Sequence, residues 1–132
     1  MEEQDKKTLV ELYLSKGEET LADAILCIEN RRWNSAANRL YYAVFHVLNA
    51  LLVSDEKPAC SHKGMRLVFG KNYVLTGLAS EEEAHLLSRM ETMRNKADYD
   101  CTFTAKEEVV SDLFPQVMDL VEHLKSLVKR ER

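Results

Sequence analysis

Five polar side chains recur along one apolar stretch of the sequence at the spacing of a helical face. They are Ser35, Arg39, Tyr42, His46 and Asn49, separated by four, three, four and three residues. Residues three or four apart share one face of an α-helix, so the five form a polar stripe. Unpaired polar groups cost roughly a few kcal/mol each when buried. The stripe therefore either meets solvent or joins helices, or it forms the wall of a ligand groove or of a dimer interface.

A second group of chemically capable residues is Arg94, Asp98 and Tyr99. Arg94 and Asp98 are four residues apart and can form an ion pair, which is worth only a few tenths of a kcal/mol when exposed. One interpretation is an ordinary solvated ion pair beside a packed tyrosine. The other is a catalytic group in which the arginine contacts a phosphate.

A third candidate is the segment His62, Lys63 and Gly64, with Arg66 following. It enters a short helical pattern, and cationic side chains beside free amides at a helix N-terminus can hold a phosphate. Short basic segments are common in loops, so this motif alone is a weak signal. His85 and His123 are isolated on charged helix faces and are interpreted as surface residues.

The histidines and cysteines do not suggest a metal centre. Cys27, Cys60 and Cys101 are odd in number and widely spaced, as expected of reduced thiols in a cytosolic protein. No His-Glu-x-x-His or Cys-x-x-Cys motif occurs. We expect neither a metal nor a cofactor.

The charge and hydropathy of the 132 residues limit the classes of partner. The formal net charge is −4, which disfavours tight binding to duplex nucleic acid, because that binding depends on neutralising phosphates. A local basic site remains compatible with this charge. No apolar run approaches the roughly 20 residues needed to span a bilayer, and the first residues are charged. We expect a cytoplasmic protein that does not bind membranes.

The hydrophobic periodicity predicts the elements that position these residues. Four long helical patterns and one short one are present, at about residues 5–29, 33–53, 62–72 and 81–97 and in a last stretch that follows Thr104. The second pattern is apolar nearly all round, which is typical of a helix surrounded by others. The pattern predicts an all-α protein, an antiparallel up-down four-helix bundle with an additional short helix.

Local signals refine the expected helix boundaries. Ser80 with Glu83, and Thr104 with Glu107, have the spacing of capping boxes, in which each side chain satisfies a free backbone amide. Gly17 interrupts the first pattern and predicts a weak point there, although Leu12 still belongs to its apolar stripe. A proline inside the last pattern, Pro115, predicts a kink.

Three segments together resemble a known family. The string Asn38-Arg39-Leu40-Tyr41-Tyr42-Ala43-Val44-Phe45-His46 is similar to the second-helix signature of small stand-alone prokaryotic HEPN proteins. Ser61-His62-Lys63-Gly64 with Phe69-Gly70 resembles the next segment, and Arg94-Asn95-Lys96-Ala97-Asp98-Tyr99-Asp100 with Phe103-Thr104 resembles the third. The segments occur in the expected order and span about residues 5–128. The resemblance implies a single HEPN-like helical domain over residues 1–132.

The resemblance also implies a partner and an activity. HEPN proteins usually form homodimers, many are metal-independent ribonucleases, and many are paired with a minimal nucleotidyltransferase as a toxin–antitoxin module. The nuclease branch carries an arginine followed, after four to six residues, by a histidine. Arg94 matches the arginine, but Tyr99 stands where the histidine would be, and tyrosine with a pKa near 10 is a poor base. A modifiable tyrosine that some paired members carry two positions later is replaced here by Cys101.

Three functions remain open from the sequence. The first is a nucleotide- or RNA-binding subunit paired with a nucleotidyltransferase, in which Arg94 contacts phosphate and Arg39, Tyr42, His46, His62 and Lys63 line the groove. The second is an active metal-independent endoribonuclease toxin, in which His46 or His62 replaces the missing base. The third is a non-catalytic adaptor whose polar stripe is a protein interface.

Overall fold

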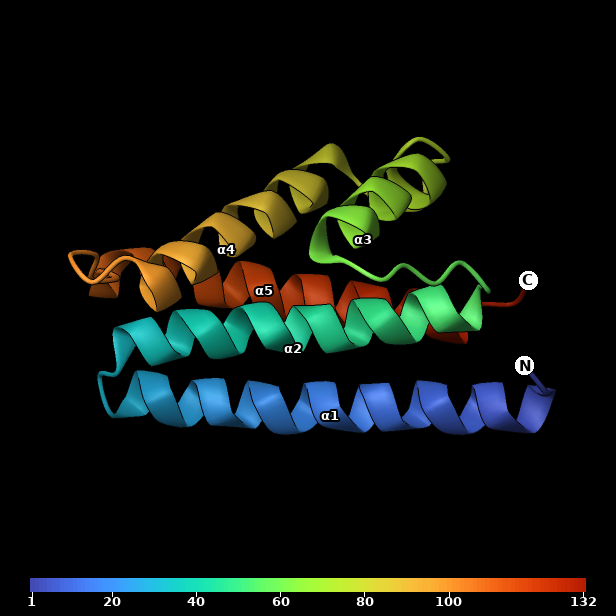
Figure 1. Cartoon of the computed structure of the whole chain (residues 1–132), viewed down its shortest axis with the longest axis horizontal. Coiled ribbons are helices and arrows are strands. Elements are labelled where there is room, and N and C mark those ends of the chain that lie inside the picture. The colour runs from blue at the N-terminus through green and yellow to red at the C-terminus, as the bar shows by residue number, and fades with distance from the viewer.

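Helices α1 and α2 lie side by side along the length of the molecule and run in opposite directions (Figure 1). The structure is a computed structural model that describes residues 1–132. Its elements are α1 (Glu3–Glu29), α2 (Trp33–Ser54), α3 (His62–Phe69), the π-helical turn η1 (Gly70–Val74), α4 (Glu81–Tyr99) and α5 (Glu107–Lys129). The predicted all-α, up-down architecture with one short extra helix is confirmed. None of these helices combines the length and the apolarity needed to cross a bilayer.

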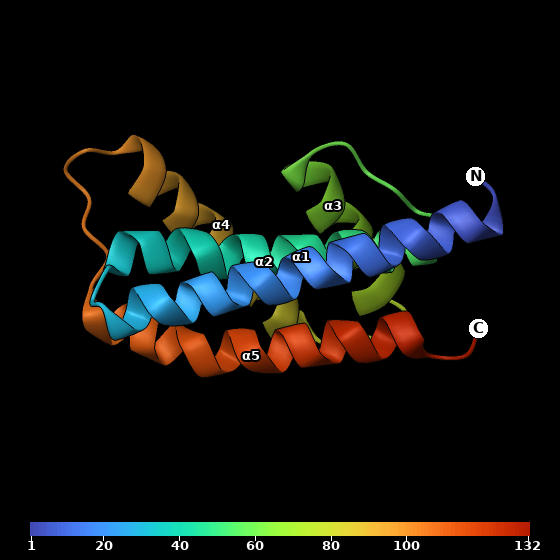
Figure 2. The same cartoon turned by 90° about the horizontal axis from the view of Figure 1, so that it is seen from below.

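The remaining helices pack around α2. In Figure 1, α4 is inclined to the α1–α2 pair, and α3 lies near the end of α2. Figure 2 places α5 on one side of that pair and α3, with the C-terminal half of α4, toward the other. Both views place the two chain termini at the same end of the bundle.

Helix α2 forms the centre of the core, as its apolar pattern predicted. Eleven of its residues are buried, and they pack against α1, α4 and α5. The buried hydrophobic residues of the whole chain form one cluster of 29 side chains. Its largest fully buried members include Tyr73, Phe69, Leu40 and Leu48. Because α2 is enclosed, its polar residues are restricted to a narrow strip beside α1 and α4.

Two predictions for α1 are wrong. Gly17 does not interrupt the helix, which is continuous from Glu3 to Glu29. Gly17 is buried instead, because its missing Cβ lets α1 approach α2 closely: a Cβ built there would lie 2.7 Å from Val47 Cγ2. Leu12 does not face the core and is 61% exposed.

One of the two predicted capping boxes forms. Ser80 Oγ accepts from Glu83 N at 3.1 Å and Ser80 N donates to Glu83 Oε1 at 2.9 Å, so α4 begins as expected. The box at Thr104 is wrong, because α5 begins after Lys106 and has no side-chain cap. The loop before α5 is fixed by α2 instead, since Ala105 N donates to Asn34 Oδ1 at 2.6 Å. Helix α5 continues through Pro115, and the kink there stays a prediction.

Replacing Gly17 by alanine should destabilise the protein. Alanine gains about 1 kcal/mol of helix propensity over glycine, but the new methyl group would overlap the fully buried Val47 and overpacking typically costs about 1–3 kcal/mol. We expect a net loss of stability in urea unfolding. Gly70→Ala is the matched control, because its backbone is helical and nothing lies within 4 Å of the new Cβ. The free energy of unfolding of that variant should rise by about 0.4–1 kcal/mol. Equal effects of alanine at both glycines would contradict the close approach of α1 to α2.

Candidate functional site

A buried arginine stands at the centre of the site. Arg94 of α4 is only 8% exposed. Its guanidinium carbon lies 5.2 Å from the ring centroid of Tyr41 and 5.7 Å from that of Tyr42, both on α2. A cation within about 6 Å of an aromatic face is attracted by the ring quadrupole. The two tyrosines therefore hold the guanidinium in place without using its hydrogen-bond donors.

No side chain or carbonyl satisfies the donors of Arg94. Its Nε is buried without a hydrogen-bond partner. The neighbouring carboxylate of Asp98 lies 3.7 Å from Nη1, which is longer than a hydrogen bond. Arginine carries five N–H donors, and buried donors are almost always paired in folded proteins. The guanidinium is therefore a buried cation whose donors are available to an anion.

Asp98 forms the predicted ion pair with Arg94 at 3.7 Å, while its hydrogen bonds connect it to a chain of other polar side chains. Both of its carboxylate oxygens accept from Asn38 Nδ2, each at 3.1 Å. Asn38 Oδ1 in turn accepts from Arg39 Nε at 2.9 Å and Nη2 at 2.6 Å. The Arg39 guanidinium carbon lies 5.5 Å from the ring centroid of Tyr42. Arg39 and Arg94 thus both contact Tyr42, and the Asn38–Asp98 pair connects them.

A cavity opens on the same side of α2. It has a volume of about 350 Å³ and is lined by polar groups of α2 and α4 that include Ser35, Asn38, Arg39 and Asp98. Pockets that hold small molecules usually measure about 300–1,000 Å³. The cavity is therefore large enough for a small ligand beside the Arg39–Asp98 network.

His62 closes the other end of the cluster. It is the first residue of α3, where Ser61 caps the helix by accepting from Gly64 N at 2.9 Å. The imidazole stacks on Phe45, with ring centroids 4.4 Å apart, and its Nδ1 shares a hydrogen bond with the Tyr41 hydroxyl. Burial and the nearby Arg94 cation lower the pKa of His62, against an opposing effect of Glu91. The imidazole is therefore neutral at pH 7.

A buried ion pair forms the wall behind these aromatic rings. Glu91 of α4 pairs with Arg66 of α3, and the Glu91 side chain is 14% exposed. Burial, reinforced by the Glu91 charge, raises the pKa of Tyr41. The Tyr41 hydroxyl therefore remains protonated and can act as a hydrogen-bond donor but not as a general base near neutral pH.

The structure brings together most of the residues predicted from the sequence. Arg39, Tyr42, His62, Arg94 and Asp98 lie in one connected cluster. Two other predicted residues lie outside it, since Tyr99 is 79% exposed and Lys63 is exposed, and neither has a recorded interaction with the cluster.

His46 lies at the edge of the cluster. Its ring centroid is 6.3 Å from that of Tyr42, and its Nδ1 is buried without a partner. Burial and the charges of Lys16 and Arg39 lower the pKa of His46. It is a second neutral imidazole in the polar stripe.

Sequence reasoning missed three members of the cluster. The sequence places Tyr41 and Phe45 among the apolar residues of the second helical pattern, and it gives Asn38 no role beyond the family signature. A signal was available, because Asn38, Tyr41 and Phe45 are three and four residues apart and therefore lie on a face adjoining the polar stripe. No group of three His, Cys, Asp or Glu side chains has a geometry suited to a metal ion.

Comparisons with known proteins identify relatives that span the chain. A family model described as "HEPN domain" matches residues 10–127. A "UPF0332 protein" of Thermotoga maritima is 30% identical over 125 residues, which cover 95% of both chains. A protein of Methanocaldococcus jannaschii named "Putative toxin MJ0605" is 29% identical over 95% of this chain and 92% of its own. Another from that organism, "Putative toxin MJ0142", is 29% identical over 77% of this chain and 69% of its own.

The lowered pKa values of His62 and His46 predict a pH-dependent stability. The unfolded chain binds protons on these imidazoles near pH 6.5, whereas the folded chain binds them only at lower pH. The contribution of these two histidines to the free energy of unfolding is fully present above pH 6.5. It is lost as the pH falls from 6.5 toward the pKa values of the histidines in the folded chain.

Urea-unfolding midpoints measured from pH 7.5 to 5 should therefore fall less steeply for His62→Gln than for the unchanged protein. His85→Gln removes an exposed imidazole from α4 and serves as the control. A His62→Gln profile parallel to that of the unchanged protein would mean that His62 titrates alike in both states.

Proposed function

The chain belongs to the HEPN domain family, and we propose that it is the nucleotide- or RNA-binding subunit of a toxin–antitoxin-like module. Two of its relatives carry the name of a toxin. In this proposal, Arg94 contacts a phosphate of the ligand. His62 and Arg39 contact other parts of that ligand, with Tyr42, His46 and Lys63 nearby.

The observation that carries this proposal is the buried guanidinium of Arg94 with no hydrogen bond. Buried donors without hydrogen bonds cost free energy, and the ion pair with Asp98 at 3.7 Å supplies no hydrogen bond to the Arg94 guanidinium, so these donors can bind a ligand. The planar guanidinium matches two phosphate oxygens at once. Its position on Tyr41 and Tyr42 fixes its orientation before any ligand arrives, which lowers the entropy cost of binding.

The residues around Arg94 suggest how a nucleotide would lie. Asp98 and Asn38 offer acceptor and donor groups for a ribose hydroxyl or a base edge. The neutral imidazole of His62 can exchange a hydrogen bond with the ligand without adding charge. Arg39 stands at the rim of the adjoining cavity, where a second phosphate of a di- or triphosphate, or of an RNA strand, would be neutralised.

Replacing Arg94 by glutamine should reduce binding of ATP, GTP or a short single-stranded RNA by at least about tenfold, because charge-assisted contacts to phosphate contribute about 1.5–3 kcal/mol each. Isothermal calorimetry on the intact protein measures this. Arg32→Gln makes the same charge change at an exposed position of the α1–α2 connection and should bind as the unchanged protein does.

A further variant and the unchanged protein separate loss of binding from loss of folding. Arg94→Lys keeps the positive charge but lacks the paired N–H donors of the planar guanidinium. The thermal unfolding midpoint of this variant reports whether the buried site tolerates the change. Absence of heat for every nucleotide and RNA with the unchanged, folded protein would reject ligand binding. The adaptor function would then remain.

The partner in the proposed module is a minimal nucleotidyltransferase, and the chain itself acts as a homodimer in the cytoplasm. The family resemblance supports this arrangement, and the relatives named as toxins support a module of toxin and antitoxin. Tyr99 presents a phenol that is 79% exposed on the last turn of α4. Such a hydroxyl is open to a nucleotidyl-transferring partner, although it does not occupy the position of the modified tyrosine in the family pattern.

A second candidate function is metal-independent cleavage of RNA, which the geometry of His62 favours. In the tautomer whose Nδ1–H donates to the Tyr41 hydroxyl, Nε2 of the neutral His62 imidazole is free to accept the proton of a ribose hydroxyl, and Tyr41 connects His62 to the Arg94 site. Arg94 would stabilise the negative charge that develops on the phosphorus centre. His46, the other candidate base, lies further along the stripe.

Purified protein with this activity should cleave a mixed RNA pool in the presence of a chelator. His62→Ala should reduce the rate by about 10²–10⁴-fold, the usual contribution of general acid–base catalysis, and His85→Ala should not. Denaturing gel electrophoresis with end-labelled RNA measures both. Intact RNA after long incubation, with and without the partner protein, would remove the nuclease function and leave ligand binding untouched.

A further inference from the structure

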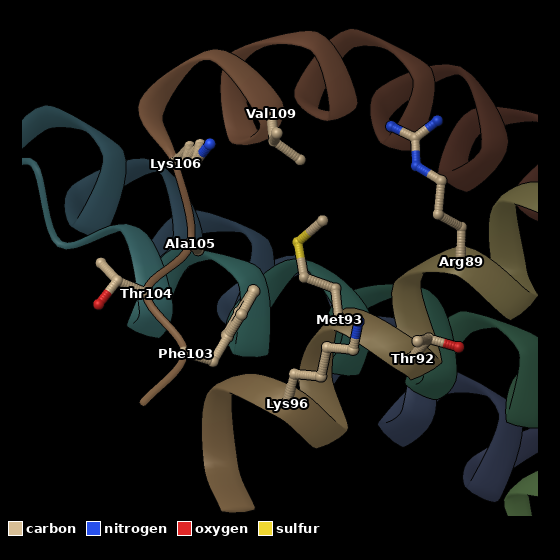
Figure 3. Close-up of a pocket in the computed structure, with 9 residues that line it drawn as sticks. All are labelled: Arg89, Thr92, Met93, Lys96, Phe103, Thr104, Ala105, Lys106 and Val109. Carbon is tan, nitrogen blue, oxygen red and sulfur yellow. The ribbon is translucent and has the colours of Figure 1, made fainter. Parts of the chain in front are cut away.

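A second cavity lies on the face of α4 opposite Arg94. Its volume is about 460 Å³, and it lies between α4, the loop that follows it and the first turn of α5 (Figure 3). Its floor is apolar and consists of Met93, Phe103, Ala105 and Val109. Val109 remains 37% exposed there. Neither the Arg94 cluster nor the polar stripe of α2 includes any of these residues.

All charged residues that line this pocket are cationic, and two threonines, Thr92 and Thr104, complete its lining. Arg89, Lys96 and Lys106 surround the floor, and no acidic side chain lines the pocket. Arg89 has a long, exposed contact of 3.4 Å with Asp112, whereas no ion pair is recorded for Lys96 or Lys106. The chain as a whole carries a formal charge of −4, so this concave cationic patch is a local exception. Concave charged surfaces concentrate ligands of the opposite sign.

The pocket is held open by contacts outside its lining. Asn34 of α2 accepts from Ala105 N at 2.6 Å and donates to Phe103 O at 3.5 Å. Asp100 accepts from both the amide and the hydroxyl of Thr102, at 2.9 and 2.6 Å. The loop that carries half of the floor is therefore fixed to α2, and the pocket is formed before any partner binds.

The positions of the three cations decide which kind of occupant fits. Arg89 and Lys96 are seven residues apart on α4, which is about 10 Å along the helix axis. Figure 3 shows Arg89, Lys96 and Lys106 on different sides of Met93 rather than converging on one point. A single phosphate needs donors that converge. Separated cations around an apolar floor instead match separated carboxylates on either side of one bulky apolar side chain.

We propose that this pocket is the docking site for an acidic segment of a partner protein. An aromatic or leucine side chain of that segment occupies the floor on Met93 and Phe103, and flanking Asp or Glu residues pair with Lys96, Lys106 and Arg89. Interfaces of this kind place an apolar anchor in a central pocket and charges at the rim. The docking site is independent of the phosphate site at Arg94, because the two lie on opposite faces of α4.

A displayed library of random 12-residue peptides, selected against the immobilised full-length chain, provides the probe. We expect the selected peptides to carry one bulky apolar residue between acidic residues. In fluorescence anisotropy, the double variant Lys96→Glu/Lys106→Glu should bind these peptides at least about tenfold more weakly, equivalent to about 1.4 kcal/mol. Lys71→Glu/Lys129→Glu makes the same charge change at exposed positions remote from the pocket and should change the affinity less than twofold.

Two further measurements complete the test. Val109→Asp places a negative charge, the same sign as that of the acidic peptide, on the apolar floor. This variant should abolish peptide binding while leaving the thermal unfolding midpoint close to that of the unchanged chain. Arg94→Gln should leave peptide affinity unchanged, and the Lys96→Glu/Lys106→Glu variant should leave nucleotide affinity unchanged, so that failure at one site is distinguishable from failure at the other. The proposal is overturned if no selected peptide depends on Lys96 and Lys106. Displacement of the peptides by AMP or inorganic phosphate at comparable concentration would also overturn it, because the pocket would then be a small-anion site.

Discussion

The enclosure of α2 is the constraint on which the rest of this structure depends. With α1, α4 and α5 packed around it, α2 can place polar groups only where its neighbours bring matching groups. Arg39, Tyr42 and His46 occupy that strip, and Arg94 is buried because α4 crosses the strip at the same level. The close approach of α1 belongs to the same packing, because the missing Cβ of Gly17 lets α1 come near Val47 and Ala43 of α2. The site is thus a consequence of how tightly the bundle closes on its central helix.

The sequence predicts structural features that depend on residues within one helical turn better than features that depend on packing against another helix. The capping box at Ser80 needs only residues three apart, and it forms. The similar spacing at Thr104 fails because α5 begins only after Lys106, and the loop before α5 is bound to α2, where Asn34, 71 residues before Ala105, accepts from the Ala105 amide. Gly17 looked like a weak point because propensity was considered without the neighbouring Val47. Long helical patterns are predictable from periodicity, whereas the residue at which α5 begins and the closeness of α1 to α2 depend on contacts between elements that are distant in the sequence.

The same distinction holds for the candidate site: the sequence identifies the helices that carry it, but not the contacts between those helices. The motif around Arg94 and the polar stripe of α2 identified the two helices that carry the site. Their interactions came only from the structure: Tyr41 supports the guanidinium and connects it to His62, although periodicity alone made Tyr41 a core residue. A tyrosine can serve both purposes, because its ring packs in the core while its hydroxyl reaches a polar neighbour. The unsatisfied Nε of Arg94 could not have been predicted, since the sequence does not show that the carboxylate of Asp98 accepts its hydrogen bonds from Asn38 of α2.

The geometry of α4 also bears on the tyrosine that replaces the expected histidine. Successive residues of an α-helix are rotated by about 100°, so Asp98 lies roughly 40° from Arg94 around the helix axis and Tyr99 roughly 140° from it. This is why Asp98 faces α2 with Arg94 while Tyr99 is 79% exposed. A side chain at position 99 therefore points away from the Arg94 of its own chain, whatever its type. Within one chain, the imidazole that the structure connects to Arg94 through Tyr41 belongs to His62.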